Sequence, residues 1–160
     1  MDSFFDRRWM LLEPAQAPMA AAVLAAGVSP LVLFDRPDRF AVGRLPQGAA
    51  AAGSLEVGEP LIEPYGEVPF PQAVADCRRM ARGFQEAGAA CLVLHGAKSL
   101  IQARAALLGA RETGLPVLLV TDLLGEGETL RGGGDILSAF VVLQELGMAA
   151  FGFSADTAGI

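Results

Sequence analysis

A unit of three parts recurs along the chain: an amphipathic segment, a glycine, and a short apolar run. It is centred on Gly27, Gly88, Gly114 and Gly147. Glycine readily adopts the left-handed conformation that ends a helix, and an uninterrupted apolar run is typical of a strand buried on both faces. The repeat therefore predicts an α/β protein with a parallel sheet.

The apolar runs also give the expected order of elements. We expect about six strands, near residues 3–6, 30–34, 50–54, 91–95, 116–121 and 149–153. Helical spacing of apolar residues is clear in 71–87, whereas 35–48 is too short and too rich in proline for a long helix. The stretch 54–71 is a long loop, and such loops in compact domains are usually functional or bind partners. The expected fold is one domain, residues 1–160, of parallel βα units resembling an incomplete TIM barrel.

Composition narrows the class of protein. The chain has 160 residues, is 52% hydrophobic, carries a net charge of −6 and has a mean hydropathy of +0.43. This length supports a sizeable core, and the apolar content argues against disorder. The charges form no basic stripe, so we do not expect nucleic acid as a partner.

Two further features bear on the setting of the protein. The uncharged run 15–34 contains Pro18, Gly27 and Pro30, so we interpret it as a helix and a buried strand rather than a membrane span. Cys77 and Cys91 lie in apolar stretches without metal-type spacing. They predict buried thiols and a reducing, cytoplasmic compartment.

Several motifs carry a resemblance to a known family. They are GSLEVGEPLIEPYGEV (53–68), EAGAACLVL (86–94), SLIQARAALLGARETGLPVLL (99–119) and LQELGMAAFGFS (143–154). The chain resembles homocysteine S-methyltransferases and the homocysteine-binding barrel of B12-dependent methionine synthases, most strongly over 53–154. The resemblance implies a TIM barrel, methyl transfer to homocysteine, and a zinc ion held by three cysteines.

The chain departs from that family where its chemistry lies. Ala155 stands where the family has a zinc-binding cysteine, and the sequence stops at Ile160, before the family's other two cysteines. We therefore expect no catalytic residue, no zinc and no other cofactor. The resemblance and the ends of the strands give the substrate-binding candidates, which are Asp6, Ser54, His95, Asp122 and Ser154.

Two other groups of polar residues leave alternatives open. Oxygen and nitrogen ligands that follow different strands could hold a hard metal ion; they are Asp35, His95, Asp122, Ser154 and Asp156. Glu63 and Glu67 could act as an acid–base pair, although the surrounding prolines favour a stiff, solvated loop.

Three hypotheses for function follow. The first is a catalytically degenerate methyltransferase-like domain that acts as a binding or regulatory module, with a small amino acid as a possible ligand. The alternative is a methyltransferase component whose barrel and zinc site are completed by another polypeptide. The third is a structural role, either as a self-associating subunit or as a decayed gene product without a defined ligand. Because open sheet edges tend to be paired or covered, we expect a homo-oligomer or a barrel-completing partner.

Overall fold

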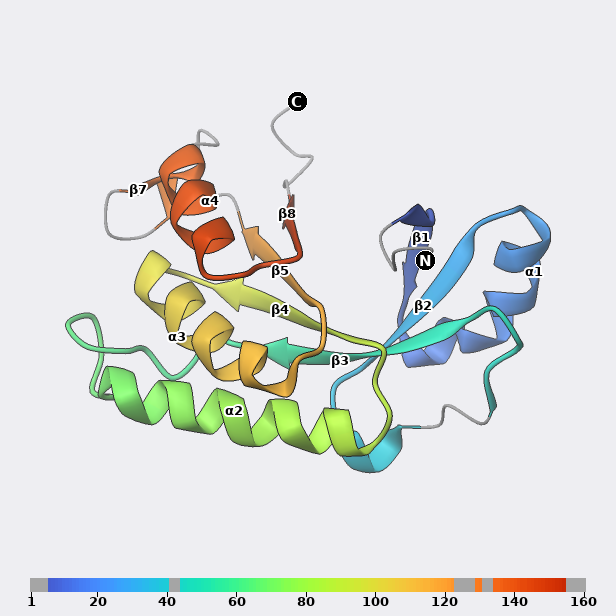
Figure 1. Ribbon diagram of the computed structural model, residues 1–160, viewed down its shortest axis with the longest axis horizontal. Coiled ribbons are helices and arrows are strands. Elements are labelled where there is room, and N and C mark those ends of the chain that lie inside the picture. The colour runs from blue at the N-terminus through green and yellow to red at the C-terminus, as the bar shows by residue number, and fades with distance from the viewer. Residues whose placement is uncertain (1–5, 41–43, 123–128, 131–133, 155–160) are drawn as a thin grey trace.

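Six parallel strands form one curled sheet. The computed structural model describes residues 6–40, 44–122, 129–130 and 134–154. Its strands are β1 (Trp9–Leu12), β2 (Ser29–Phe34), β3 (Ala50–Glu56), β4 (Cys91–Ala97), β5 (Val117–Asp122) and β8 (Ala150–Ser154). They lie in the order β1-β2-β3-β4-β5-β8 (Figure 1), and every neighbouring pair is parallel. The expected incomplete TIM barrel is confirmed as a half-barrel.

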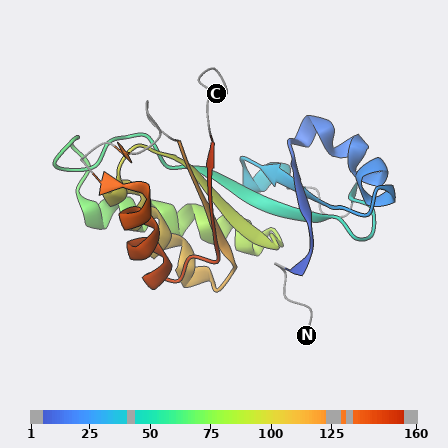
Figure 2. The same cartoon turned by 90° about the horizontal axis from the view of Figure 1, so that it is seen from above.

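Helices connect successive strands. They are α1 (Ala20–Ala25), α2 (Phe70–Glu86), α3 (Leu100–Ala110) and α4 (Ile136–Glu145), with short 3-10 helices at Pro14–Met19, Pro37–Arg39 and Arg111–Thr113. A small hairpin of β6 (Thr129–Leu130) and β7 (Gly134–Asp135) precedes α4. Figure 2 shows that α2, α3 and α4 share one side of the sheet. None of the helices in the described segments is long and apolar enough to cross a membrane.

The first strand is the one that the sequence misplaces. We expected it near 3–6, of which residues 3–5 lie outside the described residues, but the strand that pairs with β2 is Trp9–Leu12. Its four-residue apolar run lies beside Ser29, Pro30, Leu31 and Val32. The other five strands are confirmed, and β3 and β4 each continue two residues beyond their expected ends.

The outer face of the sheet carries most of the core. Leu92, Leu94 and Leu119 are fully buried beneath α2 and α3. A Cβ atom on Gly53 would lie 2.4 Å from Cγ of Phe84, so the glycine lets that ring of α2 rest directly on β3. Packing this close makes α2 and the middle strands one unit.

The inner, concave face has a second and smaller cluster. Leu31, Ala52, Cys91 and Val93 are buried there, with partly buried hydrophobic residues around them: Trp9, Leu33, Ala50, Leu118 and Val120. Side chains alternate between the two faces of a strand, so Cys91, Val93 and His95 of β4 point inward. The polar residues that continue this alternation beyond the cluster form the site described next.

Candidate functional site

A cavity of about 410 Å³ lies on the inner face, toward the carboxyl ends of the strands. Its size is within the range of small-molecule sites, and barrel enzymes place their chemistry at this end. Apolar side chains form part of its wall, and Glu13, Asp35, Ser54 and His95 supply the polar groups. The full lining is Leu11, Glu13, Pro14, Leu33, Asp35, Ser54, Val93, His95 and Val120.

His95 is held by a carboxylate on the neighbouring strand. Glu56 and His95 are register partners of β3 and β4, and Nδ1 of His95 lies 3.2 Å from Oε2 of Glu56. The other oxygen of Glu56, Oε1, accepts a hydrogen bond of 3.2 Å from the backbone N–H of Gly58. Both oxygens of the carboxylate therefore have a polar neighbour, Gly58 N–H for one and the imidazole for the other.

An irregularity in β4 makes room for this carboxylate. The pairing with β5 shifts between Leu94 and Ala97, and Gly96 in the shifted segment has a φ of +77°. A Cβ atom at this position would lie 1.8 Å from Oε1 of Glu56. Glycine is required here both for the left-handed backbone and for the space above it. The bulge lets Glu56 lie over the end of β4.

The structure brings together some of the expected residues. Ser54 and His95 line the cavity, as does Asp35 of the alternative metal ring. Asp122 and Ser154 are register partners at the ends of β5 and β8, and their side chains lie outside the described part of the chain. Asp6 is exposed and precedes β1, at the opposite end of that strand from the cavity.

Two acidic residues of the site were missed in the sequence. Glu13 follows β1, and it lines the cavity because the strand begins at Trp9 rather than near residue 3. Glu56 was assigned to the loop because β3 was expected to end at residue 54. The alternation of Ser54 and Glu56 was the available signal, since residues two apart in a strand share a face.

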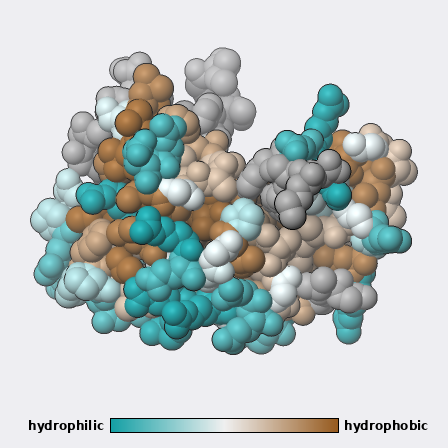
Figure 3. All heavy atoms as spheres, viewed as in Figure 1, coloured by the Kyte–Doolittle hydropathy of each residue, from teal (hydrophilic) through white to brown (hydrophobic). Residues whose placement is uncertain are grey.

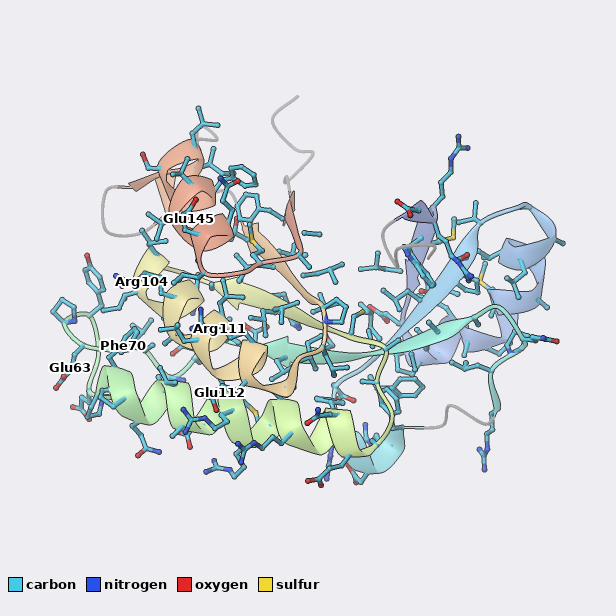
Figure 4. The ribbon with its side chains drawn as sticks, in the orientation of Figure 1. Glu63, Phe70, Arg104, Arg111, Glu112 and Glu145 are labelled. Carbon is cyan, nitrogen blue, oxygen red and sulfur yellow. The ribbon has the colours of Figure 1, made fainter. Side chains whose placement is uncertain are left out.

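The described residues do not support the two alternatives from the sequence, a metal site at the strand ends and an acid–base pair in the loop. Within the described residues, no group of three or more His, Cys, Asp or Glu side chains could hold a metal ion. Asp156 of the alternative ring, like Ala155, lies outside the described residues. Glu63 and Glu67 are exposed, and Figure 4 shows Glu63 on the outermost part of its loop, pointing away from the sheet.

The two thiols are not part of the site's chemistry. Cys77 and Cys91 are free and buried, as expected from the sequence. Burial raises the pKa of each thiol to about 12. A thiol with so high a pKa is a poor nucleophile near neutral pH, because the thiolate is the reactive form.

Comparison with solved structures supports the fold. The chain is similar to the carboxyl transferase domain of Rhizobium etli pyruvate carboxylase, with a TM-score of 0.61 and 14% identity over 90% of this chain and 26% of that one. The same domain with pyruvate gives 0.58, at 15% identity and the same coverage. A protein named as a phosphonomutase from Burkholderia cenocepacia gives 0.54, at 16% identity over 91% of this chain and 61% of that one.

This chain thus spans about a quarter of the carboxyl transferase domains and less than two thirds of the phosphonomutase. No protein-family model and no curated protein matches its sequence. At these identities the likeness shows the fold alone.

These neighbours correct the resemblance to homocysteine S-methyltransferases. The similar structures are a carboxyl transferase and a phosphonomutase, so the methyltransferase and methionine synthase assignment is wrong. The two functional hypotheses that depended on this assignment are therefore wrong as well. They are the degenerate methyltransferase-like module and the methyltransferase completed by another chain. The motifs that carried the resemblance lie largely in helix–glycine–strand units, which any parallel βα barrel uses.

Proposed function

We propose that the chain forms a proton-transfer site for a small oxygenated molecule, with His95 as the general base. The observation that carries this proposal is the pair formed by His95 and Glu56 at the cavity. A histidine oriented by a carboxylate and open to a cavity is the arrangement that general acid–base catalysis requires.

The two residues have separate roles. Nδ1 of His95 lies 3.2 Å from Oε2 of Glu56, so the carboxylate favours a proton on Nδ1. Nε2 is then the nitrogen that can accept a proton from a bound molecule. The imidazolium that forms is stabilised by the same carboxylate and later returns the proton. Ser54, from the same inner face of β3, can donate a hydrogen bond to a substrate oxygen.

The charge of the cavity limits the class of substrate. Glu13 and Asp35 line it, Glu56 lies beside it, and its described lining includes neither lysine nor arginine. One of the similar domains was solved with pyruvate, which is an anion. Carboxylates repel anions, so we propose that this site favours neutral carbonyl compounds over carboxylates such as pyruvate.

Exchange of carbon-bound hydrogen in D2O tests this function. The probes are dihydroxyacetone, which is neutral, and pyruvate, with exchange followed by proton NMR. We expect the wild-type chain to accelerate exchange of dihydroxyacetone more than that of pyruvate. His95→Asn should remove the acceleration, which for one general base is about 10²–10⁴-fold. Equal exchange in the wild type and in His95→Asn would show that His95 is not the base.

A second candidate function rests on the acidic rim alone. Glu13 and Asp35 could bind a small ammonium compound. This class of ligand includes the small amino acid expected from the sequence, whose ammonium group the two carboxylates would bind. Calorimetric titration with 2-aminoethanol and with glycolate separates the charge classes. Binding of the amine alone, weakened by Asp35→Asn, would favour this candidate, and binding of neither compound would reject it.

We also propose self-association in a reducing, cytoplasmic setting. The two buried free thiols support the compartment. Each edge strand, β1 and β8, pairs on one side only among the described residues. Leu137, Phe140 and Val141 of α4 are exposed, and Figure 3 shows apolar residues gathered over the region of α4. Sedimentation equilibrium tests this assembly, and a monomer at micromolar concentration would contradict it.

A further inference from the structure

We infer that Gln102 is a positioning residue that holds Glu56, and through it His95, in working orientation. This inference rests on the proposed function, because it concerns the same pair of residues. Gln102 lies in the first turn of α3, and its hydrogen bonds join it to Gly58, Lys98 and Ser99 rather than to His95 or Glu56. Its effect passes through the backbone of Gly58.

The amide of Gln102 joins two segments that are far apart in sequence. Gln102 is only 2% exposed, and its side-chain Nε2 donates a 2.9 Å hydrogen bond to the carbonyl oxygen of Gly58. Oε1 accepts from the backbone N–H of Lys98 at 3.1 Å and from Oγ of Ser99 at 3.3 Å. Donor and acceptor ends are both used, which also fixes which way the amide faces.

Gly58 is thereby held on several sides. Its carbonyl accepts from Gln102, and its N–H donates to Oε1 of Glu56. A Cβ atom on Gly58 would lie 2.2 Å from the carbonyl oxygen of Gly96, so the loop also packs directly against the bulge of β4. The donor that aims Glu56 therefore has little freedom while the Gln102 contact is intact.

A buried glutamine is a costly choice for helix packing alone. Its neighbours along α3, Ala103, Ala105 and Ala106, are buried and apolar. A buried amide is destabilising unless its donor and acceptor are both satisfied, as they are here. Its partners are the turn that starts α3 and the loop that carries Gly58.

The protonation pattern of His95 reports on this arrangement directly. His95 is the only histidine in the chain, so its ring nitrogens can be followed by 15N NMR without other imidazole signals. The carboxylates near it are Glu56 from β3, Asp35 at the end of β2 and Glu13 after β1. With Glu56 in place, we expect the neutral ring to carry its proton on Nδ1.

The decisive variant is Gln102→Met, which keeps the length of the side chain and removes its hydrogen bonds. We expect the neutral ring to shift toward the Nε2–H form, as in Glu56→Gln. Gln85→Met is a matched control, because Nε2 of Gln85 also donates to a backbone carbonyl, that of Thr113 at 2.7 Å, away from the cavity. The control should keep the wild-type pattern.

Each result separates the inference from the function on which it rests. A folded Gln102→Met with the wild-type pattern, together with a shifted Glu56→Gln, overturns the role of Gln102 and leaves the His95–Glu56 pair intact. An unshifted Glu56→Gln overturns the pair itself. If Gln102→Met does not fold, Gln102→Asn replaces it. That variant keeps a buried amide but is too short to span both partners, and it should give the same shift.

Discussion

The two faces of the same strands are built differently. On the outer face, leucines of β4 and β5 are fully buried under α2 and α3, and Phe84 lies on Gly53 at contact distance. On the inner face, the buried positions are fewer, and Leu33 and Val120 are only partly covered. The outer face therefore contributes most of the buried apolar surface, whereas the inner face is less tightly packed and borders a cavity with polar groups in its wall.

The largest expected effect comes from the outer face. Phe84→Ala removes a ring that is 2% exposed and leaves a void above Gly53. We expect the free energy of unfolding to fall by about 3–5 kcal/mol, the usual cost of truncating a buried phenylalanine. Urea unfolding followed by circular dichroism measures it. A loss below about 1 kcal/mol would mean that the outer face is not the main store of stability.

The loss of stability at alkaline pH allows the two faces to be compared, because each contains one buried thiol. Cys77 belongs to the outer core and Cys91 to the inner cluster. Burial raises the pKa of each from 9.0 to about 12, so the folded state keeps its protons where the unfolded state releases them. This stability is complete below about pH 9 and is lost as pH rises through about 12. At pH 10 we expect a loss of about 1 kcal/mol per thiol.

Urea unfolding at pH 8 and pH 10 measures the alkaline loss, and Cys77→Ala and Cys91→Ala remove each contribution separately. Equal contributions would show that the inner cluster is as dry as the outer core. A contribution from Cys77 alone would show that water reaches the depth of the inner face.

The smallest effect belongs to the inner wall. Leu33→Ala shortens a partly buried side chain beside the cavity. We expect a loss of about 1 kcal/mol, because only part of its surface leaves water on folding. The same urea measurement applies, with Leu94→Ala as the outer-face control. Equal losses for the two variants would contradict the contrast between the faces.

The fold was largely readable from the sequence, and the site only in part. Glycines followed by apolar runs are local signals that placed four of the strands, and an apolar run placed β3. Glu13 was missed because its place in the cavity lining depends on where β1 starts, and Glu56 because its place beside the cavity depends on how far β3 continues. The contact of Glu56 with His95 depends on the register of β3 and β4, which local patterns do not encode. The family resemblance failed for a related reason, since repeated βα units look alike across barrels of different chemistry.

The register of β3 and β4 has a consequence for insertions and deletions. Ser54, Val93 and His95 line the inner cavity, and Glu56 shares the alternation of Ser54, because β3 keeps its alternation to Glu56 and β4 keeps it as far as His95. Losing a single residue within Ala50–Glu56 would turn the following side chains toward the helices and carry Glu56 away from His95. A residue added to the outermost part of the 57–69 loop would leave both strands in place. Length variation among relatives of this chain should therefore collect in that loop and be rare inside β3 and β4.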